Sequence, residues 1–188
     1  MPDRIPGITM LHQMSPLHCW AACAESVLQY YGINQNQQQI NAAFGGGPMG
    51  GTPAPALNHH HVLASRTDHP QRIADRTLRA IEAERLKRKL KEEIRAQRPV
   101  VVGLYNAFDD LGGNTSKLYF MAFAHAMVIF GYDKATKRFE MLDPGQEDVV
   151  AHATALDLVS GWLPYGKLNR GFGMYLLYGK RFFYTKRP

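Results

Sequence analysis

Residues 13–32 read QMSPLHCWAACAESVLQYYG, and this stretch predicts a buried helix. Ser15 is a typical N-cap residue, proline suits the first helical position, and Gly32 is placed to end the helix. Apolar side chains recur every three or four positions, at Trp20, Cys23, Ala24, Val27, Leu28 and Tyr31. We therefore expect a core helix over about 16–31 with Cys19 in its first turn.

Outside this helix, apolar spacing predicts further helices before residue 98 and strands after it. Residues 45–58 are rich in glycine and proline, which predicts a long surface loop. Residues 71–97 carry apolar residues at helical spacing with one break in register, so we expect two helices or one kinked helix that ends before Pro99. The expected strands are 100–105, 124–132, 138–142, 173–178 and 181–184, with a hairpin connection at 133–137.

Helices that precede strands indicate an α+β fold, in which an antiparallel sheet packs against helices. We expect one domain over 1–188, mainly helical over 1–98 and mainly β-sheet over 99–188. The 188 residues are 45% hydrophobic and 20% charged, which is ordinary for a globular domain and excludes disorder and collagen-like repeats. Only 2 cysteines are present, too few for a disulfide framework.

Charge and hydropathy favour neither a nucleic-acid-binding surface nor a membrane span. The net charge is +6, but the basic stretch at 85–91 belongs to a segment with the i,i+4 pairs Glu84–Arg88 and Asp75–Arg79, which suggest a solvated helix face. The most apolar segment, 118–131, is shorter than the roughly 20 residues of a membrane span and contains His125. The first twenty residues lack the basic-then-apolar pattern of a Sec signal peptide.

The position of Cys19 at a helix start has chemical meaning. Free N–H groups and the helix dipole stabilise a thiolate there, and a neighbouring imidazolium stabilises it further. The alternative is that Cys19 is one more small core residue. Cys23 lies one turn later, where a disulfide to Cys19 would require distortion, so we expect a buried free thiol.

Three runs in the same order resemble the papain-like cysteine peptidases of bacteria. They are residues 13–23 (QMSPLHCWAAC), 124–133 (AHAMVIFGYD) and 141–145 (MLDPG). The resemblance spans nearly the whole chain and is strongest to the bacteriocin-leader peptidase type and to staphopain-like effector proteases of plant pathogens. It implies a papain-like fold in which the nucleophile at a helix start packs against a C-terminal antiparallel sheet.

The resemblance also implies a role for each of four residues. Cys19 is the nucleophile, His125 the general base and acid, and Asp143 the group that orients the imidazole. The side chain of Gln13 and the backbone N–H of Cys19 form the oxyanion hole. The chain departs from the pattern at Ala124, where glycine is usual, and at His18, where a small or polar residue is commoner.

No metal or organic cofactor is expected for this chemistry. The histidines of 58–61 (NHHH) and His69 suggest a metal site, but no spaced Cys/His set completes four ligands. Contact with substrate is the better interpretation of this segment.

Two alternatives to a protease stay open at this point. The same triad would serve a protein glutamine deamidase or amidase, in which ammonia or another amine leaves from Cys19; cleft shape, which depends on residues 45–70, would separate the two. A non-catalytic binding module with a papain-like fold is the third interpretation.

The expected biology follows from the resemblance to effectors. We expect a protein or peptide substrate and a bacterial effector or toxin that is made in the cytoplasm and delivered by a specialised secretion system such as type VI. A cognate immunity or inhibitor protein would then cover the cleft.

Overall fold

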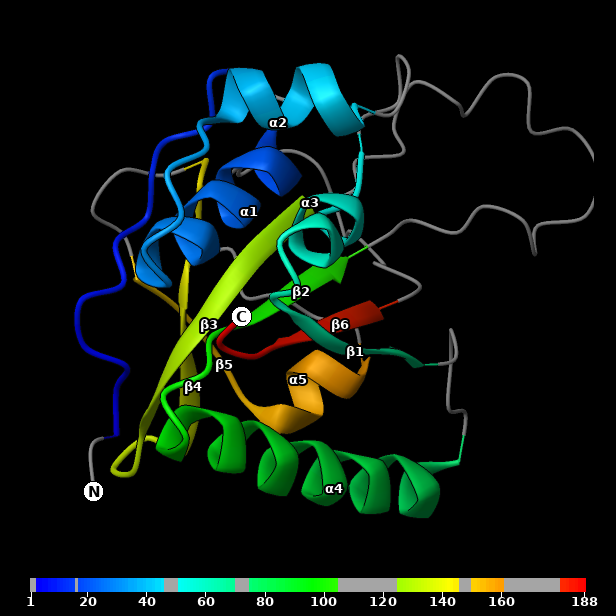
Figure 1. Ribbon diagram of the computed structural model, residues 1–188. Helices are drawn as coiled ribbons and strands as arrows, with labels where there is room; N and C mark the ends of the chain where they lie inside the picture. The colour runs from blue at the N-terminus through cyan, green and yellow to red at the C-terminus, as the bar shows by residue number, and fades with distance from the viewer. Residues whose placement is uncertain are drawn as a thin grey trace, which may run out of the picture.

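A six-stranded sheet, antiparallel throughout, forms the centre of the computed structural model (Figure 1). The structure describes residues 3–15, 17–45, 51–69, 75–104, 125–145, 150–160 and 180–188. The strands are β1 (Leu63–His69), β2 (Val100–Leu104), β3 (His125–Asp133), β4 (Arg138–Leu142), β5 (Val150–Ala153) and β6 (Lys180–Thr185). Their order across the sheet is β1-β6-β2-β3-β4-β5.

Five helices pack around this sheet in the described part of the chain. They are α1 (Cys19–Tyr30), α2 (Gln37–Phe44), α3 (Ala54–His59), α4 (Arg76–Arg95) and α5 (Ala155–Ser160). Figure 1 shows α1, α2 and α3 gathered on one side of the sheet and α4 and α5 on the other. No helix within the described ranges is long and apolar enough to cross a bilayer. The expected α+β architecture, with helices packed on an antiparallel sheet, is confirmed.

Helix α1 is the buried core helix that its sequence predicts, but it begins later. The expectation that Ser15 caps it is wrong: the carbonyl of Ser15 accepts the N–H of His18 at 3.0 Å, which makes a turn. The N-cap is His18, without a side-chain capping bond, so Cys19 is the first helical residue. The helix ends as expected before Gly32, whose φ of 82° is open to glycine at little cost.

Helix α4 is one continuous helix rather than two. Asp75 caps it by accepting the N–H groups of Thr77 and Leu78. The register break that the sequence shows corresponds to a change in packing, since Leu78 and Ile81 are 56% and 45% exposed. The apolar residues of the second half, Leu86, Leu90 and Ile94, are buried in the core.

The strand predictions are confirmed where the structure describes them. Strands β2, β3 and β4 match the expected ranges within one residue, and the hairpin connection follows β3 as expected. The expected strand 181–184 is the centre of β6. The expected strand 173–178 lies outside the described residues.

Several elements were not expected from the sequence. The predicted loop over 45–58 is wrong over its last part, where α3 begins beside Pro53, because proline is well suited to a first helical turn. Helix α2, strands β1 and β5 and helix α5 are further additions. Helix α2 carries a readable signal, because Asn36 and Gln39 form a reciprocal capping box.

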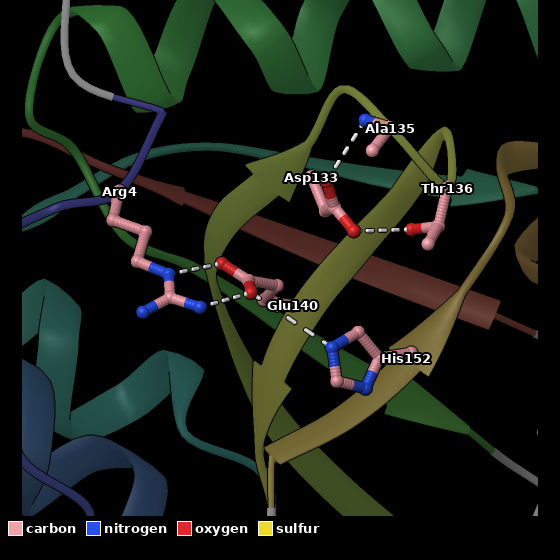
Figure 2. A network of polar contacts seen from close by, with 6 residues as sticks. All are labelled: Arg4, Asp133, Ala135, Thr136, Glu140 and His152. Carbon is pink, nitrogen blue, oxygen red and sulfur yellow. Dashed lines mark hydrogen bonds and ion pairs between the residues drawn. The ribbon is translucent and has the colours of Figure 1, made fainter.

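The N-terminal segment (residues 3–15) lies alongside the end of β3 that extends beyond β2. The N–H of Ile5 donates to the carbonyl of Phe130 at 2.8 Å, and the N–H of Tyr132 donates to the carbonyl of Asp3 at 2.7 Å. The guanidinium of Arg4 forms two hydrogen bonds, of 2.6 and 2.5 Å, with the carboxylate of the buried Glu140 on β4 (Figure 2). Two parallel hydrogen bonds of this kind fix the orientation of the guanidinium relative to the carboxylate as well as the distance between them.

Gly131 lies between the two partners of this fork. A Cβ at Gly131 would collide with the Glu140 carboxylate and would lie 3.0 Å from Cγ of Arg4. The residue paired with Glu140 in the β3–β4 ladder is Gly131 itself. Glycine is therefore required here for close approach.

We expect Gly131→Ala to lower the free energy of unfolding by about 1–3 kcal/mol, because the added methyl displaces the buried Glu140 carboxylate from Arg4. Urea unfolding monitored by circular dichroism measures this. The control is Lys134→Ala, which removes an exposed ion pair with Asp3 and should change stability by less than about 0.5 kcal/mol. Equal stabilities for Gly131→Ala and wild type would contradict the packing argument.

Candidate active site

The β3–β4 hairpin brings His125 and Asp143 together. His125 is the first residue of β3, and Asp143 directly follows β4. Because the strands are antiparallel and Val128 pairs with Leu142, the start of one strand lies beside the end of the other. The Nε2 atom of His125 lies 2.8 Å from Oδ1 of Asp143.

Helix α1 brings Cys19 to the same place. The helix packs on β3, and Cys19 is its first residue, 4% exposed. His125 also shares a side-chain hydrogen bond with Cys19. Since Nε2 faces Asp143, Nδ1 is the ring nitrogen left for the sulfur. The structure thus brings together the three residues expected to form a triad, in the order thiol, imidazole, carboxylate.

These contacts decide the charge of His125. Burial by itself lowers its pKa, but hydrogen bonds to Asp143 and Cys19, and the attraction of both charges, raise the pKa to about 9. The imidazole is therefore protonated at neutral pH. Because this value lies above the ordinary 6.5, the stability that His125 contributes is complete below about pH 6.5 and is lost as pH rises through about 9.

Asp143 is held by more than the imidazole. Its side chain is 2% exposed, and Oδ1 also accepts the N–H of Gly145 at 2.8 Å. Two donors on one buried oxygen leave the carboxylate little freedom to turn. A buried carboxylate in this position keeps the imidazole in one orientation.

Gln13, the fourth expected residue, lies beside the other three. Its N–H donates to the carbonyl of Pro144 at 2.9 Å. A Cβ at Gly145 would lie 3.3 Å from Oδ1 of Asp143 and 3.8 Å from both Oε1 of Gln13 and Cε1 of His125. These three side chains therefore converge on Gly145, where any side chain would reach into the space between them.

One atom of the Gln13 amide has no hydrogen-bond partner in the described part of the chain. This atom is Oε1, which is buried. Buried polar atoms without partners are rare, and at a site they mark a place for a ligand. Two more buried atoms without partners, Nδ1 of His18 and Nε1 of Trp20, belong to the neighbours of Cys19 on either side.

Cys23 is the buried free thiol that the sequence predicts. Burial, then repulsion by Cys19 and Asp143, raises its pKa well above the ordinary value. It therefore stays protonated and unreactive beside the site.

The backbone at Gly51 lies close to helix α1. A Cβ at Gly51 would lie 2.5 and 2.6 Å from Cε2 and Cζ2 of Trp20, so the backbone lies against the indole next to Cys19. Sequence reasoning missed Gly51 and Gly145, because a close backbone approach leaves no mark in the sequence beyond the glycine itself.

The histidines of 59–61 take part in local contacts. His60 shares a 2.8 Å hydrogen bond with Oε1 of Gln35, and the ring of His59 lies against Phe44. In the described ranges no group of three or more His, Cys, Asp or Glu residues is arranged to hold a metal ion.

Comparison with known proteins identifies the family and the fold of this chain. The model of the peptidase C39-like family matches residues 5–169. The fold is similar to that of a protein described as a C39-like peptidase from Bacillus anthracis, with a TM-score of 0.58, 14% identity, and coverage of 100% of this chain and 98% of that one. It is also similar to a double glycine motif protease from an AMS/PCAT transporter, solved in complex with the leader peptide.

The second similarity has a TM-score of 0.53, 16% identity, and coverage of 97% of this chain and 93% of the other. A search of curated protein sequences finds no match. The family model spans most of the sequence, including the helix that bears Cys19 and the hairpin that bears His125 and Asp143. The chain belongs to the peptidase C39-like family and is a cysteine peptidase.

Proposed function

We propose that this protein hydrolyses peptide bonds with Cys19 as nucleophile, His125 as proton shuttle, Asp143 as the orienting carboxylate and Gln13 as an oxyanion donor. The contact chain from Asp143 through His125 to Cys19 is the observation that supports this most strongly. It supplies the three functions that acyl transfer to sulfur needs: a nucleophile, a proton carrier and a group that fixes the carrier.

The proposed reaction has two steps that use the same groups. In the first, the ionised sulfur of Cys19 attacks the carbonyl carbon, the C–N bond breaks, and protonated His125 gives its proton to the leaving amine. A thioester remains on Cys19. In the second step, neutral His125 takes a proton from water, the hydroxide attacks the thioester, and the acid leaves with restoration of the thiolate–imidazolium pair.

Negative charge develops on the carbonyl oxygen of the substrate during the attack. Hydrogen-bond donors that are already in place stabilise this charge. The N–H of Cys19 lies at the start of α1, where the first amides have no helical partner. The side-chain N–H of Gln13 offers a second donor from the opposite segment, and the buried Oε1 atom of the same amide has no hydrogen-bond partner within the described residues. One such donor contributes about 2.7–4 kcal/mol to lowering the barrier.

Peptide bonds are the favoured substrate because the family consists of peptidases. One structural relative is a double glycine motif protease bound to a leader peptide, so a leader-type peptide with a Gly-Gly motif is the first specific substrate to test. Glutamine deamidation uses the same groups, and mass spectrometry of the products distinguishes the two reactions.

The effector role is part of the same proposal. It rests on the resemblance of residues 13–23 and 124–133 to effector proteases and predicts harm to a target cell that depends on Cys19. Expression of wild type and of Cys19→Ala in bacterial and eukaryotic cells tests it. Equal growth with both proteins in every compartment would contradict the effector role, but it would not contradict the proposed peptidase activity.

We expect Cys19→Ala to abolish hydrolysis of fluorescent casein and of Gly-Gly leader peptides, because it removes the proposed nucleophile and the neighbouring Cys23 is held protonated by burial, which raises its pKa. The matched control is Cys23→Ala, which removes the neighbouring buried sulfur and should retain activity in the folded fraction. Initial rates and peptide mass spectrometry measure both. Activity that survives Cys19→Ala would mean that another group is the nucleophile.

We expect hydrolysis to fall as pH rises through about 9, because His125 then loses the proton that the leaving amine needs. Asp143→Ala removes a contact that raises this pKa, so the upper limb of the rate profile should move to lower pH, toward 6.5. Initial casein rates between pH 5 and 10.5 measure the shift. Asp133→Ala removes a partly exposed carboxylate at the far end of β3 and should leave the limb in place. If the alkaline limb of the rate profile stays in place in Asp143→Ala, Asp143 does not set the pKa of the proton carrier.

A further inference from the structure

We propose that Gln37 is a positioning residue for Gln13: its buried side-chain amide binds the backbone on both sides of Gln13 and so holds the oxyanion donor in place. The inference rests on the proposed function, since it assigns Gln37 a role through Gln13. It concerns a residue on α2, an element with no other connection to the chemistry.

Two hydrogen bonds carry the inference. Nε2 of Gln37 donates to the carbonyl of His12 at 2.9 Å, and Oε1 of Gln37 accepts the N–H of Met14 at 3.0 Å. The two groups bonded are those that flank Gln13 in the chain. Gln37 is only 4% exposed, so this amide is a buried polar group with both functions satisfied.

An amide that donates to one residue and accepts from the next but one imitates the backbone of a neighbouring β-strand. It therefore fixes the extended course of residues 12–14. The third backbone contact comes from the opposite direction, because the N–H of Gln13 donates to Pro144, next to Asp143. Gln13 is thus held between α2 and the turn that carries the triad carboxylate.

A further bond extends this hold to the nucleophile helix. The N–H of Leu11 donates to Oγ of Ser26, a buried residue of α1, at 3.3 Å. The backbone before Gln13 is therefore bonded to α1, and the backbone on both sides of Gln13 is bonded to α2. The N–H of Gln13 itself is bonded to Pro144, which follows β4. The side chain that emerges from this frame is that of Gln13, whose Oε1 atom has no hydrogen-bond partner among the residues that the structure describes.

Helix α2 does not need this amide for its own stability. Its N-terminus is capped reciprocally by Asn36 and Gln39, with bonds of 2.9 and 3.0 Å. Gln37 is the first helical residue, and its side chain turns away to the N-terminal segment. Burial of an amide costs free energy unless its bonds are made, so the arrangement serves the segment that it binds.

The consequence for catalysis is geometric. An oxyanion donor acts only at about 2.7–3.1 Å from the oxygen that becomes charged, and a displacement near 1 Å can cost on the order of 100-fold in rate. Without Gln37, the N–H of Met14 and the carbonyl of His12 would turn to water, and the side chain of Gln13 would sample positions away from the carbonyl oxygen.

The test uses Gln37→Met, which keeps the length and volume of the side chain and removes both hydrogen bonds. Asn36→Ala is the matched control, because it weakens the cap of the same helix by about 1 kcal/mol and leaves the amide of Gln37 in place. Hydrogen exchange measured by NMR should show that Met14 loses protection in Gln37→Met and keeps it in Asn36→Ala.

Two reactions of Cys19 then distinguish a misplaced oxyanion donor from a general loss of structure at the site. Alkylation by iodoacetamide creates no oxyanion, whereas acylation by p-nitrophenyl acetate does. We expect Gln37→Met to slow acylation about 10-fold or more while alkylation changes less than about twofold. Gln13→Ala should slow acylation about 100-fold, and the double variant Gln13→Ala/Gln37→Met should be no slower than Gln13→Ala alone.

Three results would overturn the inference: unchanged protection of Met14 in Gln37→Met, equal slowing of alkylation and acylation, or a double variant slower than Gln13→Ala by the full factor of Gln37→Met. Failure of the proposed function looks different. In that case wild type and Cys19→Ala would release p-nitrophenol equally, while the loss of protection at Met14 in Gln37→Met would still show that Gln37 holds the backbone around Gln13.

Discussion

The packing of helix α1 against strand β3 is the contact on which the candidate site depends. Every residue from Cys19 to Leu28 is buried, so α1 cannot shift along the sheet without exposing a continuous apolar surface. The first residue of this helix is Cys19, and the first residue of the strand is His125. The same burial that stabilises the fold therefore sets the distance between sulfur and imidazole.

Polar contacts fix the orientation of the side chains that apolar packing brings together. Asp143 is buried at the end of β4, and its two donors, His125 and Gly145, leave it one orientation. Buried polar groups of this kind cost free energy when unpaired, so they favour a single arrangement over near alternatives. The burial of His125 alone would remove its charge, and the contacts with Asp143 and Cys19 restore it.

The N-terminal segment joins the two ends of this arrangement. At one end Arg4 binds the buried Glu140 over Gly131, and at the other Gln37 binds on either side of Gln13. In both places a buried polar side chain of the folded body satisfies a group of this segment. These hydrogen bonds act together with the burial of Ile5 and Ile8 in the core, so the segment is held by packing as well as by polar contacts.

The sequence alone determined what depends on local periodicity: the core helix at Cys19 and the strands β2, β3 and β4. The sequence also pointed, through its resemblance to papain-like peptidases, to the four candidate site residues Gln13, Cys19, His125 and Asp143. It did not reveal α2, β1, β5 or α5, whose patterns are short and weakly apolar, although the capping box of Asn36 and Gln39 marked one of them. Tertiary structure decided where α1 begins, because Ser15 makes a turn instead of a cap. It also decided which half of α4 is buried and which side chain frames Gln13. These outcomes depend on contacts between residues far apart in the chain, and neither propensity nor spacing records which distant group will satisfy a given polar atom.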